Sequence, residues 1–217
     1  MSGLELLERP AAEQPDGLLV LHHGRGTDES DLIGLADALD PGRSLHVVTP
    51  RAPLQLPGLP GYHWYLVPRV GHPDHDSFHA ARSALAELHD ELWERTGVEP
   101  SRTVLGGFSM GSVMSYAMAF AADRPEVAGV LAFSGFMPVV EGWEASFKGR
   151  SGTGAFVTHG RRDPIISIDF ARSARERLEA GGITVSYHES DLGHQIDPAH
   201  MPLAVDWLAG VIPGPGV

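Results

Sequence analysis

The chain has 217 residues, of which 42% are hydrophobic, and its formal net charge is −12 with no cysteine. This length and apolar content predict one compact domain, residues 1–217, with 213–217 as a frayed tail. The missing cysteines exclude disulfides, thiolate catalysis and cysteine-based zinc sites, and an acidic chain without basic runs is unsuited to nucleic acid or anionic membrane surfaces.

The predicted elements alternate between strands and helices along the chain. In chain order, the pattern predicts an antiparallel edge strand at 4–10, a strand at 17–24, a helix at 28–40, a strand at 44–50, a Pro-rich loop at 51–73, a helix at 74–97, a strand at 102–108, a helix at 110–125, strands at 127–135 and 154–160, a helix at 167–182, a strand at 183–189 and a helix at 198–212.

Strands that are uniformly apolar and separated by helices indicate a mostly parallel sheet with helices on both faces, an α/β fold. The stretch between Ser134 and Thr153 is too short to hold a large cap domain. The chain has neither an apolar run long enough to span a bilayer nor a signal-peptide pattern at its start, so we expect a cytoplasmic protein without stable membrane insertion. The pattern leaves open whether it forms a homodimer.

A serine lies between two glycines where the strand at 102–108 gives way to a helix. Residues 107–111 read Gly-Phe-Ser-Met-Gly, the G-x-S-x-G pattern of a nucleophile elbow. In such a turn small residues allow the strand and the helix to approach, and the serine hydroxyl is lifted clear of the sheet. The noncatalytic alternative is an ordinary tight strand–helix turn with a capping serine. The context favours Ser109 as a nucleophile.

A serine nucleophile needs a general base and an orienting carboxylate, each on a loop after a later strand. Asp163 follows the strand at 154–160, and His194 follows the last strand. The order Ser109, Asp163, His194 is that of the α/β-hydrolases. The competing histidines are His159, His188 and His200, and the competing acids are Asp191 and Asp197. Each of these fits a structural, turn or capping role better.

The glycine-rich stretch His23-Gly24-Arg25-Gly26 follows the first central strand. Hydrolases of this class place there the loop that gives the second oxyanion-hole amide. We therefore predict that the amides of Arg25 and Met110 form the oxyanion hole, the latter at the start of a helix. The alternative is a plain glycine-rich turn with a surface arginine.

Taken together, these motifs resemble the phospholipase/carboxylesterase family of α/β-hydrolases, which includes the acyl-protein thioesterases. The resemblance spans nearly the whole chain and rests on residues 23–26, 107–111, 160–165 and 193–194. It implies a small lidless serine hydrolase with Ser109, Asp163 and His194 as triad and no metal or organic cofactor. Arg25 stands where the thioesterases carry an apolar residue, and Met110 stands where they carry Gln. These differences argue against a thioester as the substrate more than they argue against the serine-hydrolase mechanism.

Further side chains are candidates for the substrate pocket. Trp64, Phe136 and Met137 lie in loops at the expected sheet edge, where they either line an acyl pocket or pack against the core. The same two alternatives hold for Tyr62 and Tyr65, on either side of Trp64 in the loop. His75 and His79, one turn apart, could face a metal ion, but a polar helix start explains them better.

The predicted activity is hydrolysis of small carboxylic esters of carboxylesterase or lysophospholipase type. The alternatives are a thioesterase or peptidase that acts on a larger acylated partner, and a noncatalytic small-molecule binder.

Overall fold

The computed structural model describes residues 3–214, and its centre is one seven-stranded sheet in the order β1-β3-β2-β4-β5-β6-β7. The strands are β1 (Leu6–Arg9), β2 (Gly17–His22), β3 (Leu45–Pro50), β4 (Thr103–Phe108), β5 (Gly129–Phe133), β6 (Gly154–Gly160) and β7 (Thr184–Ser190). Only β1 is antiparallel to its neighbour, with Leu6 opposite Pro50. The predicted antiparallel edge strand and the mostly parallel sheet are both confirmed.

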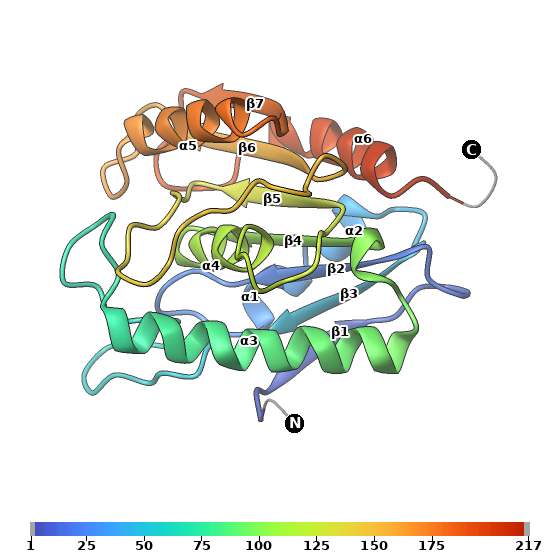
Figure 1. Ribbon diagram of the computed structural model, residues 1–217, viewed down its shortest axis with the longest axis horizontal. Helices are drawn as coiled ribbons and strands as arrows, with labels where there is room; N and C mark the ends of the chain where they lie inside the picture. Colours follow the sequence, from blue (N-terminus) through green and yellow to red (C-terminus); the bar gives the residue numbers. More distant parts are fainter. Residues whose placement is uncertain (1–2, 215–217) are drawn as a thin grey trace.

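Helices cover both faces of this sheet (Figure 1). The longer ones are α3 (His75–Thr96), α4 (Met110–Ala119), α5 (Ile168–Ala180) and α6 (Met201–Val211), and two short ones are α1 (Ser30–Ile33) and α2 (Ala36–Leu39). Buried side chains of α3, α4 and α5 pack on one face, and those of α1, α2 and α6 on the other. The 3₁₀ turns η1 (Pro100–Arg102) and η2 (Pro198–His200) precede β4 and α6.

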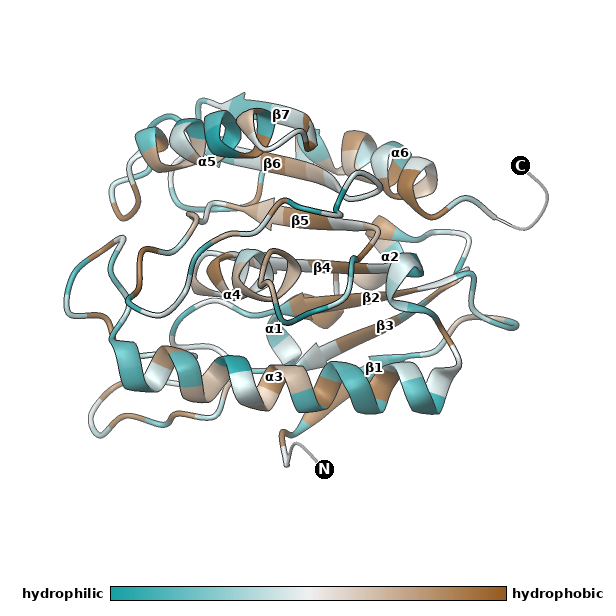
Figure 2. Cartoon of the chain, in the orientation of Figure 1, coloured by the Kyte–Doolittle hydropathy of each residue, from teal (hydrophilic) through white to brown (hydrophobic). Residues whose placement is uncertain are grey.

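Burial explains the hydropathy of these elements. Every residue of β2 is buried, and Figure 2 shows the central strands mostly in brown, as expected for parallel strands covered on both faces. Helix α3 instead alternates hydrophilic and hydrophobic turns (Figure 2), because only one side of it packs on the core. Its ends agree with the sequence pattern: Asp74 accepts a hydrogen bond from the Ser77 amide, and Gly97 has a left-handed φ of 67°.

Two predicted helices are shorter in the structure. The segment 28–40 forms α1 and α2 instead of one helix, with Gly34 and Leu35 between them, although Leu32 and Leu39 are buried as the pattern indicated. Helix α4 ends at Ala119 rather than near Pro125. Beyond this end, the Arg150 guanidinium donates to the carbonyls of Ala121, Arg124 and Pro125, so these carbonyls have partners outside a helix.

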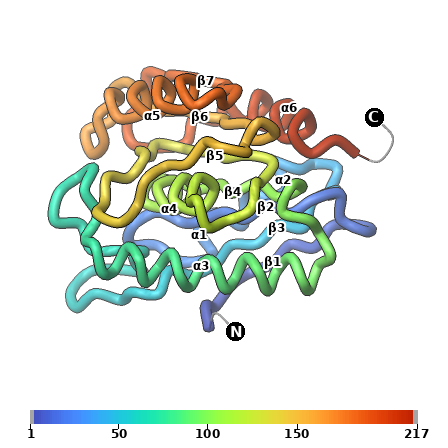
Figure 3. Tube along the Cα trace, in the orientation of Figure 1, coloured from blue at the N-terminus to red at the C-terminus, as the bar shows by residue number. Residues whose placement is uncertain are grey.

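The loops that leave the carboxyl ends of the parallel strands gather at one edge of the sheet. In Figure 1 the arrowheads of β2, β3 and β5 point to the left of the view, and Figure 3 shows the connection 51–73 turning on that same side. The connection 134–153 holds no helix or strand, so no cap domain is inserted there. The predicted frayed tail, 213–217, lies partly outside the described residues, which end at 214. Within the described part, the Pro213 carbonyl accepts a hydrogen bond from Arg102.

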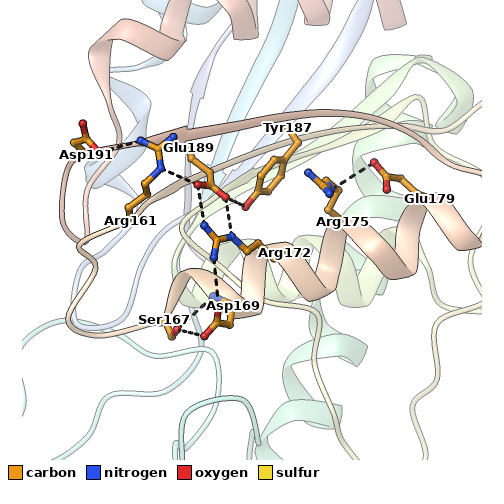
Figure 4. Close-up of polar contacts among 9 residues, drawn as sticks. All are labelled: Arg161, Ser167, Asp169, Arg172, Arg175, Glu179, Tyr187, Glu189 and Asp191. Atoms are coloured by element: carbon orange, nitrogen blue, oxygen red, sulfur yellow. Dashed lines mark hydrogen bonds and ion pairs between the residues drawn. The ribbon is translucent and has the colours of Figure 1, made fainter.

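The exposed edge strand β7 carries a set of paired charges, which we call the edge network and which consists of Arg161, Arg172, Tyr187, Glu189 and Asp191 (Figure 4). Glu189 lies at its centre and accepts hydrogen bonds from both arginines and from the Tyr187 hydroxyl. Charged side chains on an edge strand discourage pairing with a strand of another molecule.

Candidate active site

Ser109 lies in the sharp turn between β4 and α4. Its φ of 54° and ψ of −117° are a backbone conformation that non-glycine residues rarely adopt and that costs about 1–3 kcal/mol. The Ser109 amide donates to the Phe133 carbonyl on the neighbouring strand at 2.8 Å, which helps to hold this conformation.

The two glycines of the motif permit the close approach of strand and helix. A Cβ atom on Gly111 would lie 1.9 Å from the His22 carbonyl oxygen, and one on Gly107 would lie 2.6 Å from the backbone of Gly111. Both distances are far below van der Waals contact, so no larger residue fits at either position. The turn therefore has the steric features of a nucleophile elbow.

His194 and Asp163 meet Ser109 in one hydrogen-bonded line. His194, in the loop after β7, has its Nε2 atom 2.9 Å from the Ser109 hydroxyl and its Nδ1 atom 2.6 Å from Asp163 Oδ2. The Phe108 ring packs against the imidazole, with the ring centroids 4.9 Å apart. Three residues separated by 31 and 54 positions along the chain are thus brought together where three strands end.

The carboxylate of Asp163 is buried and held by its own loop. Its Oδ1 atom accepts hydrogen bonds from the amides of Ile165 and Ile166 at 2.8 and 2.9 Å. Burial raises the pKa of Asp163, but the hydrogen bonds from Ile166, His194 and Ile165 outweigh burial and bring the pKa below its usual value. Asp163 is therefore ionised at neutral pH, and it orients the imidazole so that Nδ1 carries the proton.

The competing residues have other partners. His159 Nε2 lies 3.2 Å from Asp163 Oδ2 and donates to the Ile166 carbonyl at 2.8 Å, so it contacts the carboxylate and not the serine. His200 is bonded to Thr158 and His188 to Ser186. Asp191 pairs with Arg161, and Asp197 accepts from the Ala199 amide as a cap.

Arg25 and Met110, the two predicted oxyanion-hole residues, line one cavity together with Ser109. Met110 is the first residue of α4, so its amide has no helical acceptor one turn earlier. Arg25 lies in the loop after β2 and lines two cavities together with Ser109. A helix start and a glycine-rich loop are the two sources of amides from which oxyanion holes are built.

Two cavities open beside Ser109. The larger, of about 550 Å³, is bordered by the loop after β2, by α1 and by residues around His194. The smaller, of about 70 Å³, we call the recess, and it is lined by Arg25, Tyr65, Val67, Val70, Ser109, Met110, Phe136, Ile165 and Ile166. A hollow of about 670 Å³ lies at the opposite edge, where β2, β3 and β4 begin, and not at the carboxyl ends where parallel sheets bind ligands.

Of Trp64, Phe136 and Met137, only Phe136 lines a cavity beside Ser109. Trp64 is fully buried, with its indole nitrogen donating to the His23 carbonyl, and Met137 is also buried away from both cavities. The structure thus places Trp64 between loop and core, because its ring fills the space under the loop after β2. Tyr65, for which the sequence pattern left the pocket and the core equally open, lines the recess. The pattern did not indicate Val67 or Ile165, although Ile165 is two residues from Asp163.

His75 and His79 stack with ring centroids 4.7 Å apart, but each has a protein partner, Asp76 and the Glu141 carbonyl. Among residues 3–214, no group of three or more His, Cys, Asp or Glu side chains could hold a metal ion. Over the same residues, no helix has both the length and the apolar character that a bilayer crossing requires.

Comparisons with known proteins identify the family of the chain. The model of the phospholipase/carboxylesterase family matches residues 8–212. Acyl-protein thioesterase 1 of Debaryomyces hansenii is 32% identical over 185 residues, which are 78% of this chain and 77% of that protein. Lysophospholipase-like protein 1 of Mus musculus is 29% identical over 146 residues, 65% of this chain and 60% of that protein.

Among solved structures, the Bacillus cereus carboxylesterase has the same fold. It superposes with a TM-score of 0.84 at 21% identity and covers 96% of this chain and 95% of its own. The chain therefore belongs to the phospholipase/carboxylesterase family of α/β-hydrolases and is a carboxylic ester hydrolase.

Proposed function

We propose that this protein hydrolyses short- to medium-chain carboxylic esters of small molecules, with Ser109, His194 and Asp163 as its catalytic triad. The observation that supports the proposal most strongly is the line of two hydrogen bonds, 2.9 and 2.6 Å long, from the serine hydroxyl through the imidazole to a buried carboxylate. Such a line is the geometry by which an alcohol is activated as a nucleophile.

In the first step, His194 Nε2 takes the Ser109 proton while the serine oxygen attacks the ester carbonyl. The imidazolium that forms is stabilised by the ionised carboxylate of Asp163, which faces Nδ1. The carbonyl oxygen becomes an oxyanion that accepts hydrogen bonds from the amides of Arg25 and Met110. His194 then gives its proton to the departing alcohol, which leaves Ser109 acylated.

In the second step, His194 removes a proton from water, and the hydroxide attacks the acyl-enzyme. A second oxyanion forms and collapses, the acid leaves, and the serine recovers its proton from the imidazole. Side chains, backbone amides and water perform every step.

The test is turnover of 4-nitrophenyl butyrate by Ser109→Ala. We expect the loss of essentially all activity with an unchanged circular dichroism spectrum, because the Ser109 hydroxyl hydrogen-bonds only to His194 among the described residues. A matched control is Ser83→Ala on the exposed face of α3, whose hydroxyl bonds to its own helix. A fluorophosphonate should label the wild-type protein at Ser109, whereas a noncatalytic binder would stay unlabelled. Full activity of Ser109→Ala would refute the proposal.

A thioesterase is the second candidate, supported by the 32% identity to an acyl-protein thioesterase. The same triad can cleave both bonds. The recess of about 70 Å³ favours short acyl groups over the long chains of lipidated proteins, if the acyl part enters there. Butyryl oxygen esters and thioesters, compared by kcat/KM, would separate the two candidates. A clear preference for the thioester would favour the second.

A further inference from the structure

Arg25 is an exposed arginine at the mouth of the proposed active site, and it lines the recess and the larger cavity, both of which contain Ser109. Its guanidinium has no hydrogen bond or ion pair to a described residue. The chain carries 28 acidic against 16 basic residues, so carboxylates are abundant. The lack of a partner at this position therefore needs an explanation.

The carboxylates nearest in sequence to Arg25 are engaged elsewhere. Asp28 accepts from Ser30, Asp31 accepts from Thr27, and Glu29 binds Arg51 with both of its oxygens. Arg51 also pairs with Glu5 at 2.5 Å. Arg51, in the loop after β3, is thus held by two acids, while Arg25, in the loop after β2, lines the cavities with its donors unused.

A second polar group of the recess also lacks a partner. The Tyr65 side chain is 2% exposed and packs against the Phe78 ring, and its hydroxyl makes no hydrogen bond to a described residue. Burial raises the pKa of the Tyr65 hydroxyl, and the positive charge of Arg25 opposes that rise without cancelling it. The hydroxyl is therefore protonated at neutral pH and can donate. The hydroxyl oxygen is not fully enclosed by protein atoms, and the side chain lines the recess, so this donor is available to a ligand there.

The remaining recess walls are apolar apart from Ser109, with Val67, Val70 and Phe136 among them, and Arg25 is the only charged residue of that lining. A guanidinium beside an apolar wall is less screened by water than one on an open surface. It presents two parallel donors that match the two oxygens of a carboxylate.

We propose that Arg25, together with the Tyr65 hydroxyl, binds an ionised carboxylate at the far end of the substrate's acyl group. The preferred substrates are then half-esters of short dicarboxylic acids. This inference rests on the proposed function, since it assigns the substrate class of the same site. A carboxylate fits better than a phosphate monoester, whose charge of about −1.5 to −2 at pH 7 exceeds what one guanidinium can balance.

The test compares two esters that differ only in charge. Mono-4-nitrophenyl glutarate carries the carboxylate, and 4-nitrophenyl 5-methylhexanoate has an isopropyl group in its place. The measured quantity is the ratio of kcat/KM for the charged ester to that for the neutral ester, after subtraction of spontaneous hydrolysis. A loss of oxyanion stabilisation affects both esters and cancels in this ratio.

We expect Arg25→Gln to lower the ratio about tenfold or more, because a charge-assisted pair of hydrogen bonds is lost. Arg25→Lys should lower it less, and Tyr65→Phe should lower it severalfold. The control is Arg162→Gln, an exposed arginine in the Asp163 loop that lines neither cavity. High salt should reduce the wild-type ratio and leave that of Arg25→Gln nearly constant.

The inference is overturned if the ratio of Arg25→Gln stays within about twofold of the wild-type ratio, or if Arg162→Gln lowers it equally. In either case hydrolysis of the neutral ester by wild-type protein, abolished in Ser109→Ala, would show that the proposed function stands without it. Neutral-ester turnover that survives in Ser109→Ala would instead overturn the proposed function.

Discussion

Asp163 and Glu189 are two carboxylates on neighbouring parts of the sheet, in the loop after β6 and in β7, and each accepts several hydrogen bonds. Glu189 accepts from two arginines and a tyrosine, which lower its pKa to about 2 (Figure 4). Asp163 accepts from two backbone amides and from the His194 imidazole, and its side chain is fully buried.

The difference lies in how each charge is compensated. The positive charges of Arg161 and Arg172 already compensate that of Glu189, so the role of the Glu189 carboxylate is to hold β7 to the neighbouring α5. The donors around Asp163 are neutral amides and an imidazole, so its charge is balanced only when His194 takes up a proton. A carboxylate held by neutral donors is thus suited to stabilise a transient cation, whereas one held by cations is suited to stability.

The largest expected effect tests Asp163. Asp163→Asn keeps the oxygen that accepts from Ile165 and Ile166, so the loop should persist. An amide nitrogen facing His194 Nδ1 would reverse the imidazole tautomer, and Nε2 could no longer accept the Ser109 proton. We expect kcat for 4-nitrophenyl butyrate to fall on the order of 10³- to 10⁴-fold. Stopped assays at saturating ester would measure it.

The matched control is Asp191→Asn, which removes the exposed carboxylate that pairs with Arg161 in the edge network. It should leave kcat within about twofold of the wild-type value. Equal losses of activity in the two variants would mean that the loop, and not the buried charge, is what the chemistry needs.

The approach of Ser109, Asp163 and His194 could be predicted because strand ends are readable from apolar runs and glycines. Parallel strands then bring those ends to one edge. The recess could not be predicted, since the loop 51–73 is broken by prolines and has no periodicity to indicate which side chains face inward. Trp64 and Tyr65 are adjacent in that loop, yet one fills the core and the other lines the recess. That choice depends on contacts with α4 and the loop after β2, distant in sequence.

A second prediction separates carboxylates from buried imidazoles as causes of acid unfolding. Burial lowers the pKa of His22 to about 3 and that of His89 well below its usual value, and their rings lie 5.7 Å apart. Below pH 6.5 the unfolded chain protonates these imidazoles while the folded protein does not. For His22 this costs about 2 kcal/mol of stability at pH 5 relative to pH 7, and His89 acts in the same direction.

The carboxylates act in a lower range. Because the pKa of Glu189 is about 2 in the folded protein, its stabilisation is present above pH 4.5 and is lost as the pH falls toward 2. The same sign applies to Asp163, whose pKa is also lowered. Changes in stability between pH 7 and 5 therefore report on the imidazoles and not on either carboxylate.

His89→Leu should shrink the difference in unfolding free energy between pH 7 and pH 5 by up to about 2 kcal/mol, as measured by urea denaturation. Leu85→Met, one turn earlier on the same buried side of α3, changes the core without removing a titrating group. The difference between its unfolding free energies at pH 7 and pH 5 should equal that of the wild-type protein. An unaltered difference in His89→Leu would place the acid sensitivity elsewhere.

The smallest expected effect concerns Glu189 itself. Glu189→Gln keeps the shape and removes the charge between Arg161 and Arg172, whose side chains are about half exposed. Partly exposed ion pairs contribute little, so we expect the unfolding free energy to fall by about 1 kcal/mol or less, with a smaller loss in high salt and kcat unchanged.

Because Arg161 lies in the Asp163 loop and β7 leads into the loop of His194, the edge network also joins two parts of the proposed triad. A tenfold loss of kcat at unaltered stability would show that the edge network positions those loops. Asp163 and Glu189 would then both serve catalysis and would differ only in their distance from Ser109.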